Sequence, residues 1–251
     1  MKQMLRSSLS TVLYRSRVLF GPKETGTRIL SYHRVDDGDA RYFTVPVARF
    51  REQMRFLAEE GYRTAGVKDV LEGRAGTKSV VITFDDGFRD IYENAFPILA
   101  EYGFSATLFL IGKRVGEEAF LKKSEIQEMH RKGFEFGSHT LAHPNLPELA
   151  PDQKWWEIFG SKRYLEELLG FPFDLFCYPF GQYDRESIRM VERAGYQGAC
   201  SNRPGANKTI EPYLLRRTEI SHFDTLYDFE KKMAGAYDLL HQGLHWMRGR
   251  P

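Results

Sequence analysis

Short apolar runs alternate along the chain with longer segments in which apolar residues recur three or four positions apart. The clearest run is VVITF at 80–84, which is rich in β-branched residues and followed by Asp-Asp-Gly. Such runs are typical of buried strands in a parallel sheet, and the longer segments are typical of amphipathic helices. The predicted strands are 28–33, 80–84, 106–111, 134–138, 175–178, 197–200 and 214–220. The predicted helices are 50–61, 67–71, 90–102, 124–132, 152–169, 184–194 and 229–240.

This alternation of strand and helix predicts parallel βα units. About seven strands suit a closed or nearly closed barrel better than a small open sheet, and such barrels carry their active sites at the carboxyl ends of the strands. The unusual residues of this sequence follow that rule, because each ends or follows a predicted strand: His33, Asp85, Asp86, His139 and the turn 179–181. We therefore expect them on one face of an α/β domain.

Composition excludes several classes of function. The 251 residues are 42% hydrophobic and 28% charged, with a formal net charge of +2, which is typical of a globular protein and gives no case for nucleic acid as a partner. Cys177 and Cys200 form no CxxC pair, so we expect two inert buried side chains rather than a disulfide framework or a thiolate zinc site. The oligomeric state cannot be read from the sequence.

The N-terminus is basic and weakly amphipathic. Residues 1–27 contain neither the continuous apolar core of a secretory signal nor a run long enough to span a membrane. We expect a helix that either docks on the domain or lies peripherally on a membrane, and hence a cytoplasmic or membrane-peripheral protein. The predicted organisation is an N-terminal extension (1–27), one catalytic domain (28–240) and a C-terminal tail (241–251).

Two adjacent carboxylates at the end of a buried strand repel each other and lose solvation, and a bound cation is the simplest compensation. His139 and His143 are spaced i, i+4, which on a helical turn places both imidazoles on one side. Two histidines and one carboxylate form a facial set with open positions, suited to zinc and also to iron, cobalt or nickel. One aspartate suffices as a ligand, so the other is free to act as a base on an attacking water.

Other chemistries find less support. Position 87 is Gly, where magnesium phosphotransferases generally carry a second Asp. The chain also contains neither a GxxxxGK[ST] phosphate loop nor a GxSxG nucleophile elbow.

The motifs TFDDG, SHTLAHP and YPFG, in this order and spacing, resemble those of the polysaccharide deacetylases, the NodB-homology domain of carbohydrate esterase family four. The resemblance extends from about residue 29 to about residue 237. It implies a single domain folded as a deformed (β/α) barrel of about seven strands. It also implies a metal-dependent removal of acetyl groups from N-acetylated sugars.

By this resemblance Asp85 is the catalytic base, and Asp86, His139 and His143 are the metal ligands, with Thr140 bracing the histidine loop. The implied cofactor is one divalent transition metal ion, with zinc preferred to cobalt or nickel.

The third motif implies that the backbone N–H of Phe180 helps to hold the oxyanion. Tyr178, Pro179 and Gly181 complete the motif and are expected to bind substrate.

Two positions depart from the family pattern. Cys177 stands where the third motif usually begins with the Arg that orients the base, and the C-terminal Leu-x-His that supplies the acid is not evident. A circularly permuted subgroup involved in exopolysaccharide modification instead carries the acid histidine in an N-terminal Tyr-His motif, which SYHRV resembles. His33 thereby takes the acid role, and Arg217, in preference to Arg216, replaces the missing Arg.

The predicted function is therefore removal of N-acetyl groups from amino sugars of a polysaccharide or glycan whose identity the sequence does not reveal. The alternatives are an O-acetyl esterase or small-amide hydrolase on the same barrel, and a catalytically inactive carbohydrate-binding domain. The remaining histidines are expected at the surface: His130, His222, His241 and His245.

Overall fold

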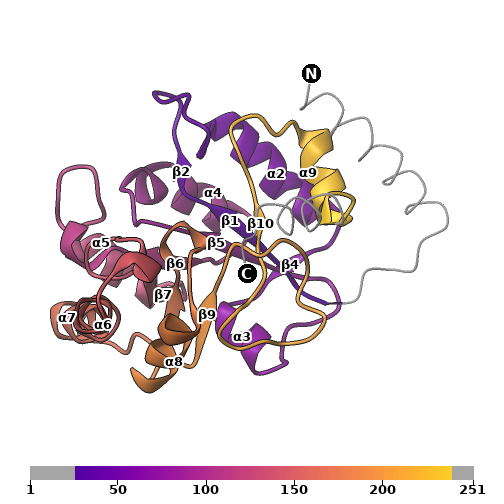
Figure 1. The fold of residues 1–251 in the computed structure, drawn as a ribbon. Coiled ribbons are helices and arrows are strands. Elements are labelled where there is room, and N and C mark those ends of the chain that lie inside the picture. The colour runs from indigo at the N-terminus through magenta and orange to yellow at the C-terminus, as the bar shows by residue number, and fades with distance from the viewer. Residues whose placement is uncertain (1–25, 239–251) are drawn as a thin grey trace.

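The computed structural model describes residues 26–238, and a curled parallel sheet forms its centre (Figure 1). The strand order is β10-β1-β5-β6-β7-β8-β9, with β4 also paired to β5, and all of these pairings are parallel. A parallel bridge between Cys200 and Leu215 joins the end of β9 to the segment that leads into β10. The sheet thus curls into a deformed barrel of seven strands in one α/β domain, as predicted.

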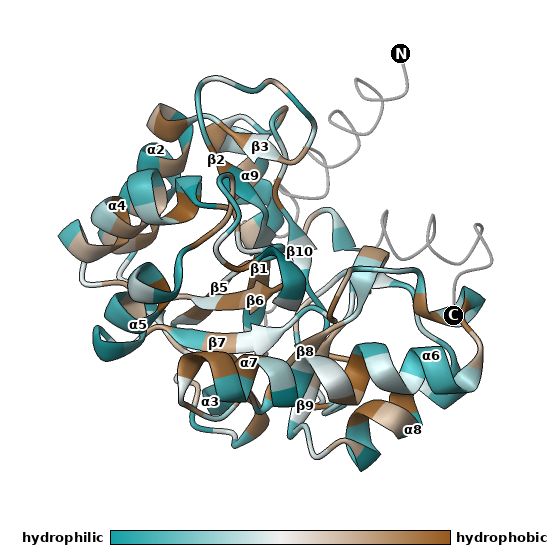
Figure 2. Ribbon diagram, turned by 90° about the vertical axis from the view of Figure 1, so that its left-hand side faces the viewer, coloured by the Kyte–Doolittle hydropathy of each residue, from teal (hydrophilic) through white to brown (hydrophobic). Residues whose placement is uncertain are grey.

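The strands are Arg28–Tyr32 (β1), Arg34–Val35 (β2), Thr44–Val45 (β3), Arg63–Thr64 (β4), Ser79–Phe84 (β5), Thr107–Leu110 (β6), Glu135–Ser138 (β7), Leu175–Cys177 (β8), Gly198–Cys200 (β9) and Thr218–Glu219 (β10). The helices are Val47–Glu59 (α2), Val67–Leu71 (α3), Phe96–Glu101 (α4), Lys123–Arg131 (α5), Pro151–Trp155 (α6), Ser161–Leu169 (α7), Arg185–Arg193 (α8) and Leu226–Met233 (α9). Strands β2 and β3 pair separately, and the helices surround the barrel, with α6 and α7 in line along one side (Figure 2).

Alternation along the strands divides the core into an outer and an inner layer. In β5, Val80 and Ile82 belong to the cluster that includes the helix residue Phe50 of α2, whereas Val81 belongs to an inner cluster with Ile29. Successive side chains of a strand point to opposite faces, so one face of β5 packs on helices and the other fills the barrel. Burial of each such side chain contributes about 1.5–3 kcal/mol.

Several predicted helices differ in detail from the observed ones. The segment 90–102 is a π-helical turn, Ile91–Ala95, followed by α4, and Pro97 occupies the first turn of α4, where its missing N–H is not needed. Helices α5 and α6 each begin one residue before the predicted start, at Lys123 and Pro151, so Ser124 and Asp152 lie inside the first turn of each helix.

The last predicted strand, 214–220, pairs in two steps. Leu215 forms a parallel bridge with Cys200 at the end of β9, and Thr218 then pairs with Leu30 of β1. Only Thr218–Glu219 therefore forms a regular strand.

None of the helices within residues 26–238 is long and apolar enough to cross a membrane. Most of the predicted N-terminal extension (1–27), and all of the tail (241–251) with His241 and His245, lie outside the described residues.

Candidate active site

The carboxyl ends of three parallel strands bring the reactive side chains to one edge of the barrel. His33 follows β1, Asp85 and Asp86 follow β5, and His139 follows β7. The Nε2 atom of His33 lies 4.0 Å from Oδ2 of Asp85, and Nε2 of His139 lies 3.7 Å from Oδ1 of Asp86. Because these strands run parallel in one sheet, residues far apart in sequence meet here.

Asp86, His139 and His143 form a candidate metal centre. Oδ1 of Asp86 is 3.7 Å from Nε2 of His139 and 3.6 Å from Nε2 of His143, and the two imidazole nitrogens are 3.2 Å apart. Side chains of this type, in a cluster of this size, provide two nitrogen ligands and one oxygen ligand for a divalent ion.

The local hydrogen bonding leaves a buried acceptor of this centre, Oδ1 of Asp86, without a partner among the described residues. His139 Nδ1 donates to the carbonyl oxygen of Cys177 at 2.7 Å, and since a carbonyl only accepts, this bond leaves the lone pair of the neutral ring on Nε2. Burial and the neighbouring His139 lower the pKa of His143 to about 4, so that this imidazole is neutral at pH 7. A cation would offset the cost of these converging acceptors, so the residues fit a metal ion.

Arg217 holds the neighbouring carboxylate, Asp85. Nη1 and Nη2 of Arg217 donate to the two carboxylate oxygens at 2.7 and 2.8 Å, and both side chains are almost fully buried. Burial alone would raise the pKa of Asp85, but the adjacent guanidinium outweighs it and holds that pKa well below its usual value. Asp85 is therefore ionised. Arg216, the alternative considered from the sequence, instead bonds to the carbonyl oxygen of Pro204.

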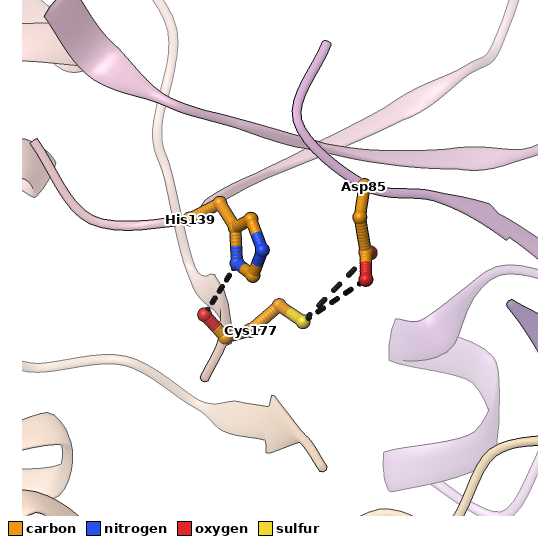
Figure 3. A group of neighbouring side chains, drawn as sticks. All are labelled: Asp85, His139 and Cys177. Atoms are coloured by element: carbon orange, nitrogen blue, oxygen red, sulfur yellow. Dashed lines mark hydrogen bonds between the residues drawn. The ribbon is translucent and has the colours of Figure 1, made fainter. Parts of the chain in front are cut away.

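Cys177 lies between Asp85 and His139 (Figure 3). Its Sγ is 3.8 Å from both carboxylate oxygens of Asp85 and accepts from Nη2 of Arg217 at 3.1 Å. Burial raises the pKa of the Cys177 thiol well above its usual value, which keeps it protonated. A protonated thiol is a poor ligand, and Arg217 already pairs with both oxygens of Asp85, so the cluster of Asp85, His139 and Cys177 fits a metal less well than that of Asp86, His139 and His143.

The two histidines do not lie on a helical turn, as their spacing had suggested, but on an irregular loop after β7. Thr140 and His143 both have left-handed backbone angles, with φ of 67° and 62°. The hydroxyl of Thr140 accepts from the N–H of His143 at 2.9 Å, and Oε2 of Glu157 accepts from the N–H groups of residues 141 and 142. These bonds fix the loop that carries both imidazoles.

The turn after β8 exposes mainly Phe180. The Phe180 ring packs edge-on against His143 at 4.5 Å and is 58% exposed, and its φ is 58°. Tyr178 and Pro179 are buried, and their contact with a substrate stays a prediction. Gly181 is a close-approach position, since a Cβ there would lie 2.6 Å from Cβ of Asn202. These three residues shape the turn that presents Phe180.

Two site residues were missed by the sequence reasoning. Asn202 Oδ1 accepts from Nη2 of Arg217 at 2.7 Å, and it follows β9, so the strand-end rule could have indicated it. Glu157 lies within a helical segment, where no pattern distinguished it. Among the other histidines, His130 is exposed and stacks on Phe171, whereas His222 is half-buried.

One family model and several known proteins are similar to this chain. The family model described as polysaccharide deacetylase matches residues 72–199, about half of the chain. The chain is 34% identical over 199 residues to a protein of Bacillus subtilis named "Putative polysaccharide deacetylase YxkH". The match covers 77% of this chain and 71% of that protein. The chain is 28% identical over 232 residues to a poly-beta-1,6-N-acetyl-D-glucosamine N-deacetylase of Staphylococcus aureus, covering 79% and 80%.

Among solved structures, the fold matches the Streptococcus pyogenes deacetylase PplD in complex with acetate, with a TM-score of 0.77 and 26% identity. That match covers 83% of this chain and 98% of the other. The family match and the identity to YxkH, together with a strand-edge site built from TFDDG and SHTLAHP, show that this chain belongs to the polysaccharide deacetylase family.

Proposed function

We propose that this protein is a metal-dependent N-deacetylase that releases acetate from N-acetylated amino sugars of a polysaccharide, with residues 28–240 as its catalytic domain. The observation that carries the proposal is the meeting of three groups within a few ångströms: the Asp86, His139 and His143 set, the Asp85–Arg217 pair, and His33. The S. aureus relative acts on a polymer of N-acetylglucosamine, and we propose this class of sugar as the substrate.

Asp86, His139 and His143 would hold one divalent transition metal ion, for which we propose zinc, with cobalt or nickel as alternatives. Such an ion supplies Lewis-acid polarisation of the acetyl carbonyl and lowers the pKa of water that it binds. All three side chains come from the turns after β5 and β7, so the set is held by the barrel edge itself.

Asp85 would accept a proton from the attacking water. Its carboxylate stays ionised because Arg217 pairs with both oxygens, and this pairing also fixes the plane of the carboxylate. Arg217 thereby performs, from the chain beyond β9, the orienting task that the family pattern assigns to the position of Cys177.

His33 would protonate the departing nitrogen. It lies 4.0 Å from Asp85, its side chain is 21% exposed, and its Nδ1 has no hydrogen-bond partner among the described residues. An acid on the first strand is the arrangement of the permuted exopolysaccharide-type subgroup, and we propose that this chain follows it. The Phe180 N–H would stabilise the oxyanion, which is supported by the packing of Phe180 against His143.

Two neighbouring substitutions test this assignment. Asp86→Asn should lose both bound metal and activity, whereas Asp85→Asn should retain metal and lose about 10²- to 10⁴-fold in rate, because only proton transfer is removed. Metal content after loading with zinc, cobalt or nickel, and acetate released from N-acetylglucosamine oligomers, are the two measurements. Equal metal loss in both variants would contradict the roles.

The same assay separates the alternatives. A protein that releases acetate from O-acetylated but not from N-acetylated sugars would be an esterase. A protein that binds oligosaccharide but releases no acetate from either, with metal bound, would be an inactive binding domain.

A further inference from the structure

A hollow beside the histidine loop is not used by the chemistry described above. Its volume is about 410 Å³, and it opens next to Pro144, the residue that follows His143. We name it the Trp156 hollow. It is lined by Pro144, Leu149, Asp152, Gln153, Trp156 and Glu157. Its far wall is the segment from α6 into the π-helical turn Trp156–Gly160, on the side of the barrel that carries α7 (Figure 2).

Trp156 forms an aromatic platform in this wall. Its side chain is 62% exposed, although a tryptophan usually buries most of its large apolar surface. Gly160 lies one turn further along, where an added Cβ would come within 3.2 Å of the Trp156 ring. The absence of a side chain at Gly160 lets the indole lie against the helix while most of the Trp156 side chain stays exposed.

The chemistry of the lining suits a sugar ring. A pyranose has an apolar C–H face and a rim of hydroxyl groups, so it needs a flat apolar surface together with hydrogen-bond acceptors and donors. Trp156, Leu149 and Pro144 provide apolar surface, and Asp152 and Gln153 are exposed polar side chains beside it. The volume falls within the range of about 300–1,000 Å³ typical of small-ligand sites.

The hollow adjoins the loop that carries His139 and His143. Glu157 lines the hollow and also accepts hydrogen bonds from the N–H groups of Leu141 and Ala142, at 2.9 and 2.8 Å. His143 and Pro144 are consecutive, so their Cα atoms are about 3.8 Å apart. A polymer whose acetyl group reaches the candidate metal centre would therefore pass close to the loop that borders the hollow.

We propose that the Trp156 hollow is a subsite for a sugar unit adjacent to the one being deacetylated, with the sugar ring stacked on Trp156. The inference rests on the proposed N-deacetylase function and adds the basis for preferring a polymer over a single sugar. Binding in the hollow contributes affinity at a distance from the reacting bond, so its loss should appear mainly in KM.

The kinetic test uses the metal-loaded full chain and β-1,6-linked N-acetylglucosamine oligomers of one to five sugars. For wild type, kcat/KM should rise with length. In Trp156→Ala, the ratio of kcat/KM for the pentasaccharide to that for the monosaccharide should fall about tenfold, which corresponds to about 1.4 kcal/mol of lost binding. Trp156→Phe should restore most of the ratio.

Tyr227→Ala is the matched control, because Tyr227 is a 41% exposed aromatic on α9, away from α6 (Figure 1). Its length dependence should equal that of wild type. Loss of activity by the same factor at every length in Trp156→Ala, or no loss at all, would overturn the subsite.

A binding measurement keeps this inference separate from the proposed function. Calorimetry with the pentasaccharide compares metal-loaded Asp85→Asn with the Asp85→Asn, Trp156→Ala double variant. Weaker binding by the double variant supports the subsite even if wild type released no acetate, which would defeat only the proposed function. Equal affinities would reject the subsite, whatever the activity.

Discussion

Replacing Arg217 with methionine would leave a buried carboxylate without its counter-ion. Arg217 donates to both oxygens of Asp85, to Oδ1 of Asn202, to the carbonyl oxygen of Ser201 and to Oγ1 of Thr83. The side chains of Arg217 and Asp85 are 1% and 3% exposed, so water cannot take over these contacts. Methionine fills a similar length but donates no hydrogen bond.

The expected cost follows from this burial. Removing one partner of a buried, hydrogen-bonded ion pair typically destabilises a protein by about 3–5 kcal/mol. Because domains of 150–250 residues lose about 2–4 °C of Tm per kcal/mol, Arg217→Met should lower Tm by about 6–20 °C. Urea denaturation and thermal unfolding of the metal-free protein at pH 7 measure both quantities.

A double-mutant cycle with Asp85→Asn tests the reason for the loss. When both charges are removed, no uncompensated carboxylate remains, so the double variant should be more stable than the sum of the two single effects predicts. The coupling between residues in one such network is about 0.5–3 kcal/mol.

Arg216→Met is the matched control. The Arg216 side chain is 27% exposed and lies 3.8 Å from Glu211, and pairs of that kind contribute about 0–1 kcal/mol. If Arg217→Met and Arg216→Met lowered the free energy of unfolding equally, or if the two changes in the cycle were additive, Arg217 would not be the counter-ion on which buried Asp85 depends.

Two further substitutions address the acid and the histidine loop. His33→Ala should bind metal as wild type does yet deacetylate N-acetyl sugars about 10²- to 10⁴-fold more slowly. The loss on an aryl acetate should be much smaller, because its leaving group needs no proton. Equal losses on both substrates would refute the acid role. Glu157→Ala removes the acceptor for the N–H groups of Leu141 and Ala142 and should weaken metal affinity about 10- to 100-fold, as the loss of a group that orients metal ligands typically does. In Glu157→Gln the amide oxygen should retain most of that affinity, and a metal titration that found both variants equal to wild type would show that the loop does not depend on Glu157.

The sequence predicted the barrel and the location of the site because both depend on the hydrophobic pattern of the strands and on the polar residues that follow each strand. Val80 to Phe84 is apolar on both faces, as a strand covered on two sides requires, and the polar residues begin where the strand ends. In a parallel sheet every strand ends at the same edge. The strand boundaries alone were therefore enough to predict that His33, Asp85 and His139 lie at the same edge.

Contacts made across the barrel could not be predicted in the same way. The preference for Arg217 over Arg216 had no basis in local sequence rules, since the two are adjacent and chemically identical. The structure separates them by burial, because Arg217 points into the barrel toward Asp85. Glu157 lies on a different element from the loop that it braces, and helical periodicity carries no information about such a partner.

The backbone conformation of the site could not be predicted from local sequence preferences either, because non-glycine residues disfavour the left-handed angles found there. Four non-glycine residues in the described part of the chain have left-handed backbone angles, namely Asp86, Thr140, His143 and Phe180. All four lie in the turns around the candidate metal centre. Each such angle costs about 1–3 kcal/mol and persists only where the surroundings enforce it.

The surroundings do enforce it. Thr140 accepts from the His143 N–H, the Cys177 carbonyl accepts from His139, and the Phe180 ring rests on His143. These contacts are made by the protein itself, and they fix the positions of the two imidazoles. A site that is preorganised in this way gains affinity and rate, because nothing needs to be ordered when the ligand binds. Local sequence preference does not predict the backbone at these four residues, because contacts from other parts of the chain hold it in place. The same contacts hold the imidazoles where they can bind a metal ion.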